Sequence, residues 1–151
     1  MTKTIQADYL IVGAGASGMA FADTLLAESA VSIILVDKEH KPGGHWNHAY
    51  SFVTLHQPSS FYGVSSKELS RGVIDKVGLN KGLNELASGA QVNAYYDDLM
   101  HEVFLPSGRV HYFPRYEYLG NGLIKSLVTG KKFNVTFQKL VDSTYYKTSI
   151  P

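Results

Sequence analysis

The feature that most constrains the fold of this chain is a glycine-rich turn between an apolar run and a helix-forming segment. Residues 7–12 (ADYLIV) are apolar and β-branched at their end, which is typical of a strand buried on both faces. GAGASG follows at residues 13–18, then an Ala/Leu/Met-rich helix pattern over 16–29 and a second buried strand pattern over 32–36. Residues 7–37 are therefore predicted to form one βαβ unit with a right-handed crossover.

Each glycine of the G-x-G-x-x-G pattern has its own physical reason. Gly13 permits the tight strand-to-helix turn, Gly15 lets the backbone approach a pyrophosphate, and Gly18 lets the helix pack close to the strand. Phosphates are expected at the helix N-terminus, where free N–H groups and the helix dipole favour an anion. The alternative interpretation is a turn that serves sheet packing alone.

An acidic residue ends the second predicted strand. Asp37 lies 19 residues after Gly18, where a carboxylate can accept hydrogen bonds from ribose hydroxyls and repels a 2′-phosphate. This argues against NADP at the first site. NAD and FAD share the ADP moiety, so the βαβ unit alone does not choose between them.

A second glycine pair follows within a short loop, as Gly43-Gly44-His45-Trp46. NAD dehydrogenases have no general need for it. With G-A-G-x-S-G-x-x-x-A at 13–22, Asp37-Lys38 and G-G-x-W, the chain resembles the two-dinucleotide-binding flavoproteins, and within them the flavin-containing and Baeyer–Villiger-type monooxygenases. Residues 55–60 and 66–69 are similar to the region after G-G-x-W in those enzymes. Residues 139–150 look like the strand closing the first part of their FAD lobe.

The resemblance implies a role for each matching residue. The backbone of residues 15–18 would hold the FAD pyrophosphate, Asp37 the adenosine ribose, and Lys38 would flank the adenine. Residues 44–46 would border the ribityl or flavin end, and residues 56–57 would lie near the isoalloxazine ring. The cofactor-binding set is Gly13, Gly15, Ala16, Ser17, Gly18, Asp37, Lys38, Gly44, His45, Trp46, His56 and Gln57. No catalytic residue is identified, and no metal site is expected, because His45 and His48 have no evident further ligands.

The remainder of the chain predicts further helices and strands. Helices are predicted at 82–88 and 91–104, and strands at 109–113, 123–128, 134–137 and 139–145. The second helix has an apolar face formed by Val92, Tyr95, Tyr96, Leu99, Met100 and Val103. Alternation at Val110 and Tyr112, and at Val135 and Phe137, predicts an antiparallel sheet. The expected fold class is α/β: a Rossmann-type three-layer FAD/NAD(P)-binding domain, incomplete, with a helical and β-meander portion.

Composition excludes several classes of protein. The 151 residues and 16.6 kDa suit a single domain (1–151). A formal charge of +1 gives no field for nucleic acid, and the absence of cysteine excludes disulfide and dithiol chemistry in this chain. No apolar run approaches the roughly 20 residues of a transmembrane helix, so we expect a cytoplasmic protein.

Two parts of the monooxygenase pattern are missing from the sequence. There is no second G-x-G-x-x-G for NADPH and no Gly-Asp of the kind that closes an FAD lobe. We therefore expect the N-terminal part of a longer flavoprotein, with the missing C-terminal portion as its partner and NADPH bound outside this chain. The predicted function is FAD binding in an NAD(P)H-dependent, monooxygenase-like oxidoreductase of unknown small-molecule substrate, inactive by itself. A non-catalytic dinucleotide-binding module and an NAD-dependent dehydrogenase fragment are the alternatives.

Overall fold

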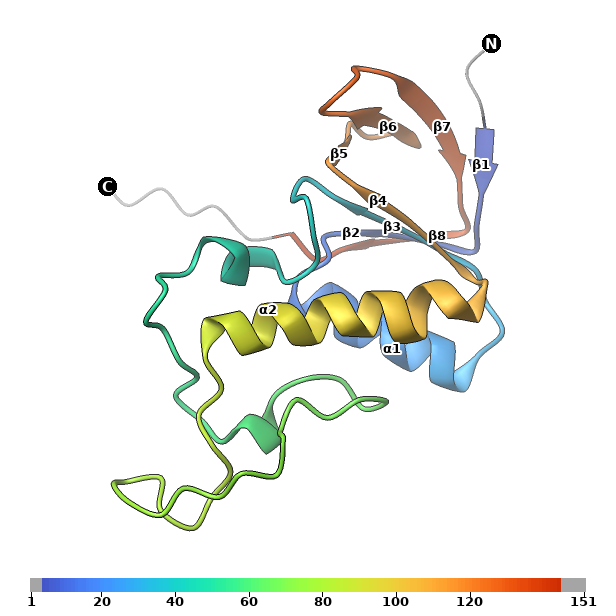
Figure 1. Ribbon diagram of the computed structural model, residues 1–151. Helices are drawn as coiled ribbons and strands as arrows, with labels where there is room; N and C mark the ends of the chain where they lie inside the picture. The colour runs from blue at the N-terminus through green and yellow to red at the C-terminus, as the bar shows by residue number, and fades with distance from the viewer. Residues whose placement is uncertain (1–3, 145–151) are drawn as a thin grey trace, which may run out of the picture.

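The computed structural model describes residues 4–144 of the chain. A parallel sheet, with strand order β4-β3-β2-β8, forms the middle layer. Helices α1 and α2 cover one of its faces, and a second sheet lies on the other (Figure 1). The bounds of these central elements are β2 Tyr9–Val12, α1 Ala16–Glu28, β3 Ile33–Asp37, α2 Gly89–Asp98, β4 Val110–Pro114 and β8 Lys139–Asp142.

The second sheet has the order β1-β7-β6-β5 and contains the β-meander. Strands β5, β6 and β7 pair antiparallel in sequence order, and β1 joins β7 in parallel. Its strands are β1 Thr4–Gln6, β5 Tyr116–Tyr118, β6 Leu123–Ser126 and β7 Lys132–Thr136. The predicted three-layer α/β fold is confirmed, and its third layer is this sheet.

The apolar runs of β2 and β3 have no alternation because both faces of the parallel sheet are covered. Ile11 and Leu35 pack toward the helices, in a cluster that includes Met19 of α1. Leu10 and Ile34 belong to a second cluster, with residues of the β-meander. All four strand residues are fully buried. Residues 9–12, 16–28 and 33–37 thus form the predicted βαβ unit.

Helix α2 begins at a capping box. The Ser88 Oγ accepts a hydrogen bond from the Gln91 N–H, and the Gln91 side chain accepts one from the Ser88 N–H. The helix continues as a π-helix, η3 (Leu99–Phe104), and a short 3-10 helix, η4 (Leu105–Ser107). Its predicted apolar face is confirmed, since all of those residues except the partly buried Val103 are buried.

The predicted helix at 82–88 is wrong. Its backbone groups bond to other segments: Leu55 N–H donates to Ala87 O at 2.8 Å, and Glu85 N–H donates to Val73 O at 2.9 Å. Gly82 has a φ of +84°, which no right-handed helix accommodates.

The predicted antiparallel pairing of β4 is also wrong. β4 pairs in parallel with β3, at the edge of the central sheet, and an edge strand is partly exposed, which produced its alternation. β8 likewise pairs in parallel, with β2. The predicted strand at 139–145 ends at Asp142, and the part of the 139–150 resemblance beyond residue 144 lies outside the described residues. Strands β1 and β5 were not predicted.

Between β3 and α2 the chain is mostly irregular. It contains two short 3-10 helices, η1 (Gly44–His48) and η2 (Ser59–Phe61), and three isolated β-bridges. Within residues 4–144, no helix is both long and apolar enough to cross a membrane. The same residues include no cluster of three His, Cys, Asp or Glu side chains suited to a metal ion.

Candidate functional site

The glycine turn lies where β2 ends and α1 begins, and two of its glycines are required by the fold. Gly13 has a φ of +105°, and its N–H donates to Val36 O at 2.8 Å. A Cβ on Gly18 would lie 2.0 Å from Gly13 O and 2.6 Å from Ser143 Oγ. Neither position accommodates a side chain without displacing backbone.

Gly15 differs from these two residues. Its φ of −81° is ordinary for any amino acid. Among residues 4–144, only Gly44 would lie within 4 Å of a Cβ there, with its Cα at 3.4 Å and its N at 3.9 Å. Neither the backbone conformation nor the packing among described residues therefore requires glycine at position 15. The absence of a side chain there leaves space open beside the start of α1.

The second glycine pair packs directly against the first turn. Gly43 N–H donates to Ala14 O at 2.9 Å, and a Cβ on Gly44 would lie 2.8 Å from Gly15 Cα. Gly43 and Gly44 have φ values of +117° and +56°. The Asn93 Oδ1 of α2 closes the other side of Gly43, at 2.7 Å from the position of a Cβ. Two segments distant in sequence thus meet backbone to backbone.

The N-terminus of α1 is open to an anion. Gly15 is the N-cap, no side-chain cap bonds to the first turn, and that turn contains no acidic residue. Ser17 is exposed, and Ala16 is partly exposed. Because the first N–H groups of a helix have no partner within it, residues 15–18 offer the donors and partial positive charge that a phosphate requires.

Asp37 lies at the end of β3, beside the same turn. Its Oδ2 accepts a hydrogen bond from Ala14 N–H, and its Oδ1 accepts one from Glu39 N–H at 2.7 Å. These bonds fix the orientation of the carboxylate, and each oxygen keeps a second lone pair for a hydroxyl donor. Lys38 is exposed and forms an ion pair with Glu117 of β5 at 2.9 Å.

Trp46 anchors η1 to its surroundings. Its indole N–H donates to the Tyr62 hydroxyl at 2.8 Å, and its carbonyl accepts from Asn93 Nδ2 at 3.0 Å. The exposed His45 ring stacks on the indole, with centroids 5.4 Å apart. The buried glycine at the start of α2, Gly89, lies against the same indole. Trp46 therefore has a structural role whatever lies beyond His45.

Two of the site residues inferred from the resemblance stand apart. His56 and Gln57 are exposed, and neither side chain forms a hydrogen bond with another described residue. They follow Leu55, whose backbone is tied to Ala87 rather than to the glycine turn. Among described residues, the contacts described above join Gly13, Gly15, Gly18, Asp37 and Gly44 at one end of the sheet and leave these two out.

Three residues at this end of the sheet were not predicted from the sequence. The Ser143 hydroxyl hydrogen-bonds to Val12 O at 2.9 Å and to Gly13 O at 3.0 Å, which fixes the turn from the β8 side. Asn93 closes Gly43, as described above. Tyr112 of β4 has a buried hydroxyl without a described partner; burial, and then the nearby Asp37 carboxylate, raise the pKa of this hydroxyl above its usual range. Ser143 falls inside the strand predicted at 139–145, and no local pattern distinguished it or the other two as site residues.

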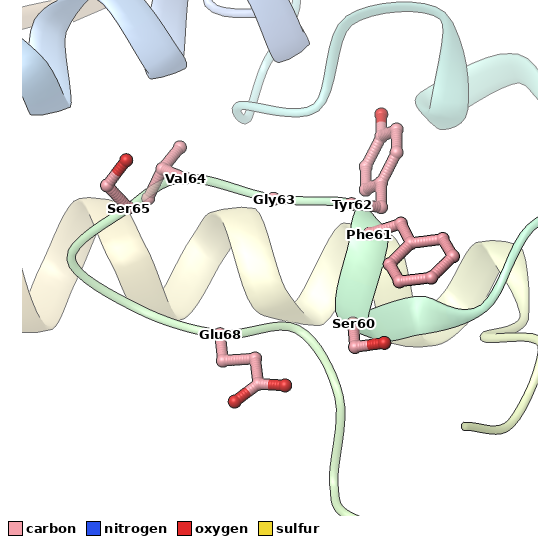
Figure 2. Close-up of a pocket in the computed structure, with 7 residues that line it drawn as sticks. All are labelled: Ser60, Phe61, Tyr62, Gly63, Val64, Ser65 and Glu68. Atoms are coloured by element: carbon pink, nitrogen blue, oxygen red, sulfur yellow. The ribbon is translucent and has the colours of Figure 1, made fainter. Parts of the chain in front are cut away.

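A separate open pocket of about 350 Å³ lies along η2 and the loop after it. Figure 2 shows Tyr62 and Glu68 pointing away from each other there. The Tyr95 hydroxyl accepts from Val64 N–H at 2.7 Å and donates to Lys67 O at 2.6 Å, so α2 holds this loop in place. The hydrogen bond between Tyr62 and Trp46 links this loop to η1, and Ser66 N–H donates to the Asp23 carboxylate of α1 at 3.1 Å.

This glycine-lined turn at the ends of parallel strands defines a Rossmann-like dinucleotide-binding fold. Residues 11–62 match the family described as NAD(P)-binding Rossmann-like domain. The chain also superposes on a flavin-containing monooxygenase from Stenotrophomonas maltophilia, with a TM-score of 0.58 and 20% identity, over 91% of this chain and 38% of that one. The S-allyl-L-cysteine S-oxygenase from Allium sativum gives a TM-score of 0.62 and 16% identity, over 91% and 36%. The resemblance to flavoprotein oxidoreductases is therefore confirmed in the fold.

A curated relative shares more of the sequence. An uncharacterized protein of Mycobacterium tuberculosis (strain H37Rv) is 50% identical over 150 residues, which is 99% of this chain and 28% of the relative. The chain therefore spans less than a third of the length of this relative.

Proposed function

We propose that the chain binds FAD, with the pyrophosphate at the N-terminus of α1. The observation that carries this proposal is the difference between Gly15 and its neighbours. Gly13 and Gly18 are required by backbone contacts, whereas Gly15 faces little but Gly44 and leaves the helix N-terminus accessible. A bound pyrophosphate accounts for the missing side chain at that position.

Asp37 and the Gly43-Gly44 pair support the same proposal. In it, the Asp37 carboxylate, held by two backbone N–H groups, accepts hydrogen bonds from the adenosine ribose. Lys38 flanks the adenine. The glycine pair keeps the chain without side chains beside the extended part of the cofactor, and His45 and Trp46 border its flavin end. His56 and Gln57 are the weakest members of the set, because no contact ties them to the turn.

The whole protein is proposed to be an NAD(P)H-dependent, monooxygenase-like flavoprotein. The match covers only part of its relatives, so the reductant site and the substrate site are assigned to the portion outside it. Bound flavin would supply hydride acceptance and the reaction with oxygen. The residues of this chain would position it through backbone N–H groups at 15–18 and through Asp37. A dinucleotide-binding module without catalysis is the second candidate, favoured by the absence of any catalytic side chain at the turn.

Cofactor binding is tested with the purified chain. We expect flavin absorbance that is released as FAD on heating, or saturable quenching of added FAD fluorescence. Riboflavin, which lacks the pyrophosphate and ADP, should bind at least about tenfold more weakly. NADP should bind more weakly than NAD because Asp37 repels the 2′-phosphate.

The outcome that contradicts the proposal is a folded chain, judged by circular dichroism, that takes up no FAD. Equal affinity for riboflavin and FAD would place the binding energy in the flavin ring and remove the role of the glycine turn. Binding of NAD in preference to FAD would favour the dehydrogenase alternative.

A further inference from the structure

A structured arm precedes α2, formed by residues 73–84 (the arm). Hydrogen bonds between Asp75 N–H and Leu83 O at 2.9 Å, and between Gly82 N–H and Asp75 O at 2.8 Å, close it into a hairpin-like excursion. The Asn80 side chain donates to Asn84 O at 2.7 Å, which adds a bond within the returning half of the arm. In Figure 1 the arm is the lowest part of the molecule and extends away from the layered core.

The arm exposes its apolar side chains although its backbone is bonded. The exposed fractions are 81% for Val77 and 108% for Leu79, at the tip. Val73, Ile74 and Leu83 are exposed by 51%, 49% and 46%, and none of the five belongs to either hydrophobic cluster. Clustered apolar exposure of this kind is unfavourable in water and marks an interaction surface.

The base of the arm is fixed to the rest of the chain. Glu85 N–H donates to Val73 O, and Ser59 N–H donates to Glu85 O at 3.0 Å. Glu85 as a whole is only 9% exposed, and its carboxylate accepts from Arg71 N–H at 2.9 Å. The arm is therefore presented from a fixed position, which lowers the entropic cost of docking.

The lengths of the relatives indicate what covers the arm. The mycobacterial relative is 50% identical across nearly all of this chain, yet the match is only 28% of its length. In that protein, a segment similar to this chain is thus joined to a much longer stretch of polypeptide outside the match. We propose that the arm docks, through Val73, Ile74, Val77, Leu79 and Leu83, onto the part of the flavoprotein that lies outside the match. The inference does not depend on FAD binding.

Backbone hydrogen exchange compares the covered and uncovered states. It is measured on this chain and on the full-length mycobacterial relative. We expect the peptide that contains the arm to exchange at least about tenfold more slowly in the relative. The control peptide is the turn between β6 and β7, where Val128 is 73% exposed, and its exchange should be similar in both proteins.

Equal exchange of the arm in the two proteins would overturn the proposal. Two further outcomes would assign the arm to another occupant. Self-association of this chain that is lost in the double variant Val77→Ser/Leu79→Ser, but kept in Val128→Ser, would identify a second copy. Binding to vesicles of phosphatidylcholine and phosphatidylglycerol that is lost in the same double variant would identify a membrane surface. The proposal expects neither, and it expects the double variant to unfold like the unaltered chain.

Discussion

At the glycine-lined end of the parallel sheet, the glycine turn, the Gly43-Gly44 pair and the end of β8 pack closely against one another. In the arm, by contrast, the backbone is hydrogen-bonded but the apolar side chains are exposed to solvent. Around the turn, Gly18 and Gly44 are packed too tightly to accommodate a Cβ. The Ser143 hydroxyl bonds to Gly13 O and packs against the turn from β8. At the tip of the arm, Leu79 contacts little but solvent. The first region is already packed within this chain, except beside Gly15. On this difference rest the two proposals, that the turn binds a small molecule and that the arm contacts protein.

Gly18→Ala should have the largest effect. The new Cβ would lie 2.0 Å from Gly13 O, so the helix and strand must separate. We expect a loss of at least about 3 kcal/mol in the free energy of unfolding, measured by urea denaturation. Ala27→Ser on the exposed surface of the same helix is the matched control, with an expected change below about 0.5 kcal/mol. Unchanged stability of Gly18→Ala would contradict this packing.

Gly15→Ala should separate binding from folding. The nearest contact of the added methyl group is Gly44 Cα at 3.4 Å, so the free energy of unfolding without cofactor should change by less than about 1 kcal/mol. FAD affinity should fall at least about tenfold, because the methyl group occupies space that the proposal assigns to the pyrophosphate. Fluorescence titration measures the affinity. A variant that binds FAD as well as the unaltered chain would show that the phosphates bind elsewhere.

Tyr95→Phe should loosen the loop between η2 and the arm. The change removes the bonds to Val64 N–H and Lys67 O and leaves a partly buried amide without its partner. The expected cost is about 1–3 kcal/mol by urea denaturation. Tyr50→Phe, at a position 74% exposed, should cost nothing measurable. FAD affinity should stay unchanged, and a large loss of affinity would show that the two regions are coupled.

Asp8 should give the smallest effect, visible as a pH dependence. Hydrogen bonds from the Ser32 backbone N–H and hydroxyl hold the pKa of the Asp8 carboxyl below its ordinary value of 3.8. Because this pKa is lowered in the folded state, the contribution to stability is present above that ordinary value and is lost as the pH falls below it. Urea midpoints of the unaltered chain should therefore fall more steeply in acid than those of Asp8→Asn. Parallel curves for the two proteins would contradict this assignment.

The sequence predicted the parts of the fold that follow from local patterns, and it failed where contacts between distant segments determine the backbone. The βαβ unit could be predicted because its strands are buried on both faces, which gives continuous apolar runs, and because its glycines have a fixed spacing. The apolar face of α2 was readable from its helical period. The false helix at 82–88 shows the limit, since Leu55 and Val73, distant in sequence, determine its backbone bonds. Ser143 reaches the glycine turn, and Asn93 reaches Gly43, only through tertiary packing, and no local pattern identifies either residue.

Amide NMR can detect, residue by residue, whether FAD places its pyrophosphate against residues 15–18. The ¹⁵N–¹H spectrum of the chain is recorded as FAD is added. We expect the largest chemical-shift changes at the amides of residues 15–18 and of Gly44, and we expect these changes to saturate together. The amide signals of residues 73–84 should not shift. Shifts centred on the arm, or on the loop around Tyr62, with residues 15–18 unmoved, would contradict this placement.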